Sequence, residues 1–227
     1  NLAGIASPVF YSKYKLETLH TTLQGTQNIL EMAKEHECES VLFFSTSEVY
    51  GNPTPENIPT PETYNGNVSC IGPRAHYDEP KRVAETLCVT YADIFNIKVK
   101  IVRPFNVYGP GMRLDDGRGL INIVKSAVLN KDLPIYGDGL STRTWTYITD
   151  AVVGFMQVLF SDANGDAFNV GIDKPEINTL DLSKLIKKYS ESDSKIIITD
   201  APVRAYKKEF DVHRRCPDIS KIKKIVK

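Results

Sequence analysis

The pattern of hydrophobic and polar positions predicts helices and short strands that follow one another along the chain. Apolar residues recur every three or four positions over 15–35, which is the spacing of an amphipathic helix. Short apolar runs, in contrast, are typical of buried strands. Helices are predicted over 15–35, from Ala75 or His76 to Tyr91, and over 120–130, 151–160 and 180–189. Strands are predicted over 41–44, 97–103, 133–136, 144–148, 167–171 and 195–199.

The order of these elements favours an α/β fold. Strand 41–44, the helix that begins near Ala75 and strand 97–103 form one parallel crossover unit, which is right-handed in nearly all proteins. Between the first strand and this helix lies a loop rich in Pro, Asn and Gly, over 51–73. Its length indicates function rather than simple connection.

Two local signals refine the predicted helices. Thr149 and Asp150 are predicted to cap the helix over 151–160. Gly25 lowers the stability of the first helix by about 1 kcal/mol relative to alanine. We therefore expect another backbone or a ligand to approach this helix closely at Gly25.

The composition argues against several classes of function. Lys plus Arg and Asp plus Glu number 28 each in 227 residues, so the charge balance does not favour binding to nucleic acid or to an anionic membrane. No apolar run approaches the about 20 residues that span a bilayer. The four cysteines lie far apart without a CxxC pair. This spacing indicates neither a zinc site nor a disulfide framework, and it favours a reducing, cytoplasmic setting.

Two segments carry the candidate chemistry. Ser45–Gly51 follows strand 41–44 and would bring hydroxyl groups and one carboxylate to the C-terminal edge of a sheet. Tyr77 and Lys81 lie four residues apart, so they share one face of the predicted helix. A lysine ammonium beside a phenol stabilises the phenolate, and we expect Lys81 to lower the pKa of Tyr77 so that this tyrosine acts as a base.

The YxxxK spacing of these two residues is weak evidence alone, but further motifs accompany it. The chain contains, in this order, LAGIASP, STSEVYG, GPRAHYDEPKRVAE, RPFNVYGPG, YGDGLSTRTWTYITD and RRCPDISK. Together they resemble the extended short-chain dehydrogenase/reductase family over nearly the whole chain. Within that family the sequence is most similar to the nucleotide-sugar enzymes, and among these to the UDP-glucuronate decarboxylases.

The resemblance implies a Rossmann-like, doubly wound parallel sheet that binds NAD, with a small C-terminal α+β lobe that binds the nucleotide sugar. The NAD-binding domain would comprise 1–108 and 144–170, and the lobe 109–143 and 171–227. Family members begin with a βαβ unit whose GxxGxxG turn holds the NAD pyrophosphate, and no such turn precedes Asn1. We expect the sequence to be an incomplete record of a longer protein, from which two to three βα units, on the order of 80 residues, are missing. The alternative is a genuine fragment that cannot hold NAD normally.

The resemblance also implies roles for the residues of the two segments. Tyr77 would remove the proton of the sugar 4-hydroxyl while hydride passes to NAD. Lys81 would hold the nicotinamide ribose, and Thr46 would hydrogen-bond the reacting oxygen. The resulting 4-keto sugar is a β-keto acid, which can lose CO2 and leave its electrons in an enolate.

The choice of product is implied by the residues that follow Thr46. The related sugar 4,6-dehydratases carry Asp-Glu where this chain has Ser47 and Glu48. A serine cannot serve as the acid that expels water, which weighs against dehydration. Glu48 would act near C5 and C6 of the sugar. Arg215 would engage the substrate carboxylate or assist protonation, and Arg214 is the alternative match.

Further residues are implied to contact the two ligands. Arginine suits phosphate because its planar fork contacts two oxygens at once. The implied substrate contacts are Tyr11, Arg74, Asn106 and Arg143, with Arg118 as a weaker candidate. The implied cofactor contacts, besides Tyr77 and Lys81, are Pro104 and Phe105 at the nicotinamide and Leu2 and Ala3 at the adenosine. For these four apolar residues a pure packing role is equally open.

Two other functions remain open. One is an enzyme of the same fold with another outcome, a nucleotide-sugar 4-epimerase or a 4,6-dehydratase. The other is a non-catalytic, truncated relative that serves as a binding or oligomerisation module. Family members are homodimers that pack the helix bearing Tyr77 and the preceding helix across a two-fold axis, so a homodimer is expected. Neither a nucleic acid nor a membrane is expected as a partner.

Overall fold

The computed structural model describes residues 1–199 and 212–225. Its larger part is built on a parallel sheet of three strands, β1 (Val41–Phe44), β2 (Val99–Pro104) and β7 (Asp166–Val170). Val41 pairs with Val99, and Val102 pairs with Phe168. Because β1 and β2 are parallel neighbours joined by a helix, the predicted crossover unit is confirmed.

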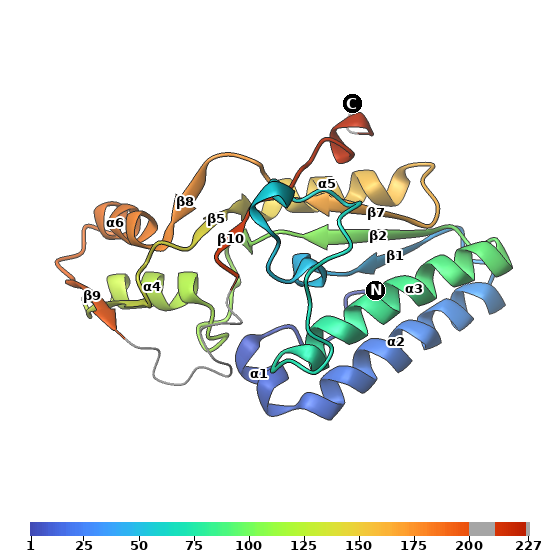
Figure 1. Ribbon diagram of the computed structural model, residues 1–227, viewed down its shortest axis with the longest axis horizontal. Helices are drawn as coiled ribbons and strands as arrows, with labels where there is room; N and C mark the ends of the chain where they lie inside the picture. The colour runs from blue at the N-terminus through green and yellow to red at the C-terminus, as the bar shows by residue number, and fades with distance from the viewer. Residues whose placement is uncertain (200–211, 226–227) are drawn as a thin grey trace.

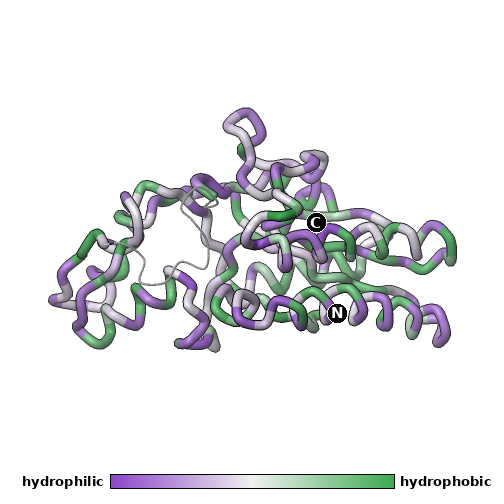
Figure 2. Tube along the Cα trace, turned by 60° about the horizontal axis from the view of Figure 1, so that its bottom comes forward, coloured by the Kyte–Doolittle hydropathy of each residue, from purple (hydrophilic) through white to green (hydrophobic). Residues whose placement is uncertain are grey.

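Helices cover both faces of this sheet, as Figure 1 shows. The long helices α2 (Lys15–Glu35) and α3 (Ala75–Phe95) pack side by side on one face, and α5 (Ile148–Phe160) covers the other. Hydrophobic and hydrophilic positions alternate along the helices in Figure 2, as expected for helices with one buried side. The face under α2 and α3 is sealed by one apolar cluster, which includes Leu30, Ala84 and Ile101.

The other face has its own apolar core. This second cluster joins Val102 and Phe168 of the sheet to Phe155 of α5. Figure 1 shows the resulting order of layers, helix, sheet and helix. The fold class expected from the sequence, a Rossmann-like α/β arrangement, is confirmed.

A smaller part of the chain lies beyond the C-terminal ends of the central strands (Figure 1). In it, β4 (Leu133–Tyr136) pairs in parallel with β9 (Ile196–Thr199). A second small sheet has the order β10-β5-β8. Its strands are β10 (Arg214–Arg215), β5 (Thr142–Thr144) and β8 (Glu176–Asn178), and the helices of this part are α4 (Gly119–Val128) and α6 (Thr179–Tyr189).

Short elements connect these two parts. Strands β3 (Val107–Tyr108) and β6 (Thr146–Tyr147) form a parallel pair. The remaining helical segments are α1 (Pro8–Lys13) and the 3₁₀ turns η1 (Ser47–Tyr50), η2 (Pro55–Asn57) and η4 (Ile222–Lys224). The domain boundaries given by the sequence stay a prediction, and residues 200–211 and 226–227 of the predicted lobe lie outside the described residues.

Two predicted boundaries are wrong. The strand predicted over 144–148 is two strands, because β5 pairs with β8 and β10 whereas β6 pairs with β3, so the chain changes sheets at Trp145. The predicted cap of α5 is also wrong. The helix begins at Ile148 after Tyr147, so Thr149 and Asp150 lie inside its first turn.

Two other observations concern single features. No described atom of this chain lies within 4 Å of the position that a Cβ would take at Gly25, so the close approach predicted there is not made within the described residues. None of the described helices is both long and apolar enough to span a membrane.

Candidate functional site

The site begins where β1 ends. The chain leaves Phe44 in extended conformation through Ser45 and Thr46, and then turns into η1. The Thr46 side chain caps this turn, since its Oγ1 accepts a hydrogen bond from the Glu48 amide at 3.2 Å. This geometry brings Thr46 and Glu48 to the C-terminal edge of the parallel sheet, where ligands of open α/β sheets bind.

Helix α3 brings Tyr77 and Lys81 to the same edge. The Tyr77 ring is buried, with 6% of the residue exposed, and its hydroxyl forms a hydrogen bond with the Thr46 side chain. The Lys81 Nζ donates to the carbonyl of Phe44 at 2.7 Å. The structure therefore gathers three of the predicted catalytic side chains, Thr46, Tyr77 and Lys81, at the end of β1.

The pKa of Tyr77 is raised rather than lowered in this structure, and its activation by Lys81 stays a prediction. Burial raises the pKa of Tyr77 to about 12, and the negative charge of Glu48 raises it as well. Lys81 does not offset these effects, because its ammonium group is directed to the Phe44 carbonyl. Burial also lowers the pKa of Lys81, to about 8.

Glu48 is fixed by two arginines from different parts of the chain. Arg74, at the start of α3, places Nη2 2.5 Å from Glu48 Oε2, and Arg215 of β10 places Nη2 2.7 Å from the same oxygen. Arg74 Nη2 also lies 3.1 Å from Asp78 Oδ1. Of the two arginines left open by the sequence, the structure brings Arg215 to Glu48, whereas Arg214 pairs with Glu176.

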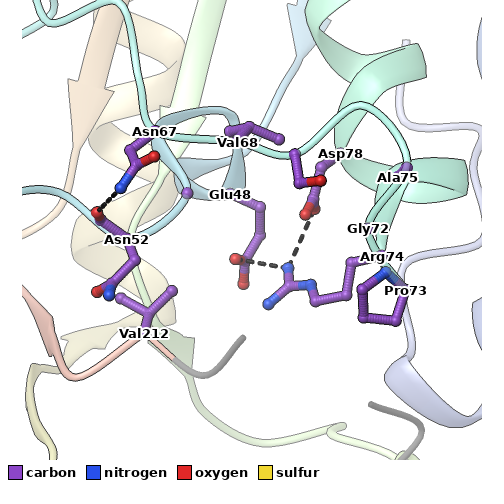
Figure 3. Close-up of a pocket in the computed structure, with 12 residues that line it drawn as sticks. Glu48, Asn52, Asn67, Val68, Gly72, Pro73, Arg74, Ala75, Asp78 and Val212 are labelled. Atoms are coloured by element: carbon purple, nitrogen blue, oxygen red, sulfur yellow. Dashed lines mark hydrogen bonds and ion pairs between the residues drawn. The ribbon is translucent and has the colours of Figure 1, made fainter. Parts of the chain in front are cut away.

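Glu48, Arg74 and Asp78 line a pocket of about 210 Å³ between η1, the loop after it and the start of α3. Figure 3 shows Glu48, Arg74 and Asp78 directed toward one another in this pocket. Burial alone would raise the pKa of Glu48, but Arg215 and Arg74 outweigh this effect and lower it to about 2. Asp78 differs: burial raises its pKa to about 7 against the opposing effect of Arg74.

Ser47 and the predicted substrate residues surround this cluster in different ways. Ser47 is buried in η1. Tyr11 stacks on Tyr77, with ring centroids 4.7 Å apart and planes 15° apart. Arg118 donates to the carbonyl of Ala6 and lies close enough to Tyr77 to lower the pKa of the phenol.

Asn106 and Arg143 differ in what they offer a ligand. Asn106 has a positive φ of 36°, and its buried Nδ2 has no hydrogen-bond partner among the residues that the structure describes. A buried amide of this kind suits a ligand oxygen. Arg143 donates to the carbonyls of Val212 and His213, the two residues that directly precede β10.

The apolar residues predicted to contact the cofactor fall into two groups. Phe105 is 1% exposed and packs with Val49 and Tyr50, which fits the packing role that the sequence left open for it. Pro104 is partly buried at the end of β2. Leu2 is 77% exposed and Ala3 is exposed too, so neither residue packs into the core.

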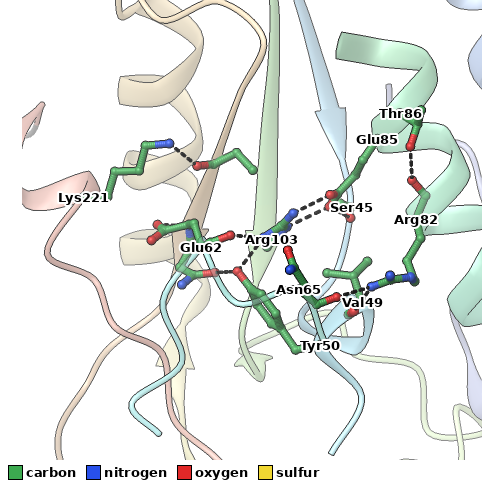
Figure 4. Close-up of polar contacts among 12 residues, drawn as sticks. Ser45, Val49, Tyr50, Glu62, Asn65, Arg82, Glu85, Thr86, Arg103 and Lys221 are labelled. Atoms are coloured by element: carbon green, nitrogen blue, oxygen red, sulfur yellow. Dashed lines mark hydrogen bonds and ion pairs between the residues drawn. The ribbon is translucent and has the colours of Figure 1, made fainter. Parts of the chain in front are cut away.

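A buried polar network lies beneath the site and was missed in the sequence (Figure 4). Glu85 of α3 accepts hydrogen bonds from Ser45 and from two nitrogens of Arg103. Arg103 Nη1 donates to the Tyr50 hydroxyl at 2.7 Å, and this hydroxyl donates to Asn169 at 2.8 Å. The network thereby joins β1, α3, β2 and β7 just below the turn that carries Thr46.

Asp78 was missed as well, although the sequence carries a signal for it. Arg74 and Asp78 are four residues apart, which is the spacing of an ion pair on one helix face. No such signal exists for Glu85 and Arg103, because their contact depends on how α3 packs on β2. The contact between Glu48 and Arg215 likewise joins residues 167 positions apart.

Comparisons with known proteins agree with this arrangement. Residues 1–171 match the model of the NAD dependent epimerase/dehydratase family. UDP-glucuronic acid decarboxylase 4 of Arabidopsis thaliana is 40% identical over 226 residues, which are 100% of this chain and 48% of that protein. The chain thus spans about half the length of the curated relatives that it matches most clearly.

Solved structures share the fold. A UDP-N-acetylglucosamine 4-epimerase from Methanobrevibacter ruminantium M1, in complex with UDP-N-acetylmuramic acid, has a TM-score of 0.87 at 23% identity, covering 100% of this chain and 69% of that one. The UDP-glucuronic acid 4-epimerase from Bacillus cereus, in complex with UDP-glucuronic acid and NAD, has a TM-score of 0.81 at 26% identity, covering 99% and 67%. The first of these likenesses supports the fold alone.

Proposed function

Because the chain belongs to the NAD dependent epimerase/dehydratase family, we propose that its full-length protein oxidises UDP-glucuronate at C4 with NAD and decarboxylates the product. The product is UDP-xylose or the corresponding 4-keto pentose. The similarity over the whole chain to proteins named UDP-glucuronic acid decarboxylases supports this choice of substrate and reaction.

The residues at the end of β1 fit the oxidation step. Tyr77 is the base for the sugar 4-hydroxyl. Its hydrogen bond to Thr46 keeps the two hydroxyl groups together, so that both can contact the reacting oxygen of the sugar. NAD, when bound, accepts the hydride from C4. Lys81 lies at the same edge of the sheet, and its ammonium group, which donates to the Phe44 carbonyl, has further donors for the hydroxyl groups of a ribose. The buried Nδ2 of Asn106, which has no hydrogen-bond partner among the described residues, fits a polar substrate.

The observation that carries the decarboxylase assignment is the clamp on Glu48. A dehydratase needs a proton donor at this place, but two arginines keep Glu48 ionised, and the neighbouring residue is Ser47. Decarboxylation expels no hydroxyl group, so it needs no acid for such a leaving group. The bond between C5 and the carboxylate breaks, CO2 leaves, and its electron pair forms an enolate that takes one proton at C5. Arg215 and Arg74 are then available to orient the substrate carboxylate.

A direct assay tests this function. The full-length protein with NAD should release one CO2 for each UDP-glucuronate consumed, and the sugar product should be identified by NMR. The assignment would be overturned by turnover of UDP-glucose without CO2 release from UDP-glucuronate. Formation of UDP-galacturonate instead would favour the 4-epimerase, the reaction named for the Bacillus cereus protein of the same fold.

A second measurement addresses the non-catalytic alternative. We expect denaturation of the purified protein to release NAD, because family members hold it tightly. An intact mass equal to that of the 227 residues, together with no released NAD, would favour a binding or oligomerisation module.

The proposed assembly is a homodimer in which α2 and α3 of two copies pack together. Large apolar side chains of these helices remain exposed, among them Leu16, Met32, Val83, Val89 and Ile94. The open space at Gly25 suits close packing of a second helix there. The cytoplasmic setting and the division into an NAD-binding domain and a substrate lobe belong to the same proposal, and the free thiols of all four cysteines support the setting.

A further inference from the structure

The carboxyl group of Asp78 has no part in the reaction described above, although Asp78 lines the pocket together with Glu48 and Arg74. Asp78 is 6% exposed and follows Tyr77 on α3. Its Oδ1 accepts a hydrogen bond from Arg74 Nη2 at 3.1 Å, and the same nitrogen lies 2.5 Å from Glu48 Oε2. Two buried carboxyl groups therefore share one guanidinium nitrogen (Figure 3).

The charges that face Asp78 are nearly balanced and come from several elements. Glu48 lies on η1, Arg74 at the start of α3 and Arg215 on β10. Arg143 of β5 acts on Glu48 from the other side. When Asp78 is ionised, the two carboxylates balance the two arginines that contact them, Arg74 and Arg215, while Arg143 acts on Glu176 as well as on Glu48. A further anion beside Arg74 and Arg215 would therefore exceed the positive charge in direct contact with it. Burial makes such an excess costly, because solvent screens it little.

Of the two carboxyl groups, Asp78 is the one that can remove this excess by taking a proton. Glu48 contacts both arginines, which hold its pKa at about 2. Among the described residues the Asp78 carboxyl group forms an ion pair with Arg74, at the longer distance of 3.1 Å. Its pKa is raised to about 7 by burial and by the charge of Glu48 against the opposing effect of Arg74.

We propose that Asp78 takes up one proton when the carboxylate of a sugar nucleotide binds beside Arg74 and Arg215, so that Arg74 exchanges its contact with Asp78 for one with the ligand. The identity of this ligand as a uronate rests on the proposed function. Asp78 acts through Arg74 and is a positioning residue. Decarboxylation turns one carboxylate and one proton into CO2 and a C–H bond, so uptake on binding brings into the pocket the same number of protons that turnover consumes.

Calorimetry tests the proposal. Full-length Tyr77→Phe protein with NAD, in which turnover is blocked, is titrated at pH 8 with UDP-glucuronate in two buffers of different ionisation enthalpy. The difference in heat gives the number of protons bound, and we expect close to one. UDP-glucose, which lacks the carboxylate, should give much less. No uptake with UDP-glucuronate, or equal uptake with both ligands, would overturn the proposal.

Variants assign the proton to Asp78. Asp78→Asn keeps an oxygen that can accept from Arg74, and in the same Tyr77→Phe background it should bind UDP-glucuronate with no proton uptake. Asp93→Asn, an exposed change on the same helix, should leave uptake at close to one. Retained uptake in Asp78→Asn would overturn the assignment. If that variant does not fold, the comparison of the two ligands still decides whether a carboxylate-linked proton exists.

A pH profile of the catalytic protein gives a readout that a merely structural role would not change. The kcat/KM for UDP-glucuronate should fall as pH rises above about 7, where Asp78 of the free enzyme ionises, and Asp78→Asn should lack this fall. The same fall in both proteins would contradict the proposal. Proton uptake without CO2 release would support the role of Asp78 and refute the decarboxylase function. CO2 release without proton uptake would support the decarboxylase function and refute the role of Asp78.

Discussion

At the scale of single residues, the site is a set of buried charges that fix one another. Glu48 is held by Arg74 and Arg215, whereas Tyr77 is held by Thr46 and covered by the ring of Tyr11. Each polar group is thereby oriented before a ligand arrives, which is the condition under which fixed dipoles and charges act most strongly on a reaction.

The first prediction concerns the proposed base. Tyr77→Phe removes the phenol oxygen but keeps the buried ring, so we expect kcat for CO2 release to fall by about 10²–10⁴-fold. The unfolding free energy should change by only about 1 kcal/mol, since one hydrogen bond to Thr46 is lost. Retention of the normal kcat would contradict the assignment, and urea unfolding serves as the control for folding.

A second prediction concerns the clamp on Glu48. Glu48→Gln removes the carboxylate partner of Arg215 and leaves Arg74 with Asp78, and breaking a buried pair in this way costs about 3–5 kcal/mol. The midpoint of urea unfolding should fall accordingly. The matched control, Glu56→Gln, changes an exposed carboxylate and should shift the unfolding free energy by less than about 0.5 kcal/mol. Equal effects of the two changes would refute the clamp.

A third prediction follows from the raised pKa of Asp78. Between its unfolded value of 3.8 and its folded value of about 7, the folded protein binds a proton that the unfolded chain does not. This contribution to stability is full below pH 3.8 and is lost as pH rises toward 7. The unfolding free energy of the natural protein should therefore fall relative to that of Asp78→Asn, by up to about 1.4 kcal/mol per pH unit.

Urea unfolding at pH 5 and pH 7 measures this difference. Asp93→Asn, with its exposed side chain on the same helix, should run parallel to the natural protein at both values. A constant difference between the natural protein and Asp78→Asn would mean that Asp78 is already ionised throughout this range.

At the scale of elements, the sequence predicted those parts of the fold that local patterns determine. The bounds of α2 follow from the spacing of apolar residues, and they are confirmed, as is the predicted start of α3 at Ala75. The strand predicted over 144–148 failed because its residues pair with two different sheets, and no local pattern reports which partner a strand takes. The sequence left open whether Arg214 or Arg215 contacts the site for the same reason. The pairing of β10 with β5 places Arg215 beside Glu48, and no local pattern reports that pairing.

The polar network under the site leads to a fourth prediction. The Tyr50 hydroxyl bonds both Arg103 and Asn169, so Tyr50→Phe leaves buried polar groups without a partner and should cost about 1–3 kcal/mol of unfolding free energy. Tyr108→Phe is the matched control, because this ring is 37% exposed, and its effect should be close to zero. Similar effects of both changes in urea unfolding would show that the network does not contribute to stability.

At the scale of the whole molecule, both layers of helices leave large apolar side chains exposed, Val153 and Phe160 of α5 among them. The helices α2 and α3 cover one face of the sheet (Figure 1), and they also carry exposed apolar side chains, Leu16, Val83 and Ile94 among them. Exposed apolar residues gathered on one face indicate an interface. A symmetric dimer would bury the same patch of both copies, as a two-fold axis requires.

The last prediction tests this interface. Val83, on α3, is 46% exposed, and Val83→Arg would place two like charges near the two-fold axis while leaving the monomer core unchanged. Light scattering after gel filtration should give a dimer for the natural protein and a shift toward monomer for Val83→Arg. Val128→Arg, a change of the same kind at an exposed residue of α4, should stay dimeric. If the natural protein is monomeric, or if both variants dissociate alike, the pairing through α2 and α3 is wrong, whereas dissociation of Val83→Arg alone locates the interface on α3.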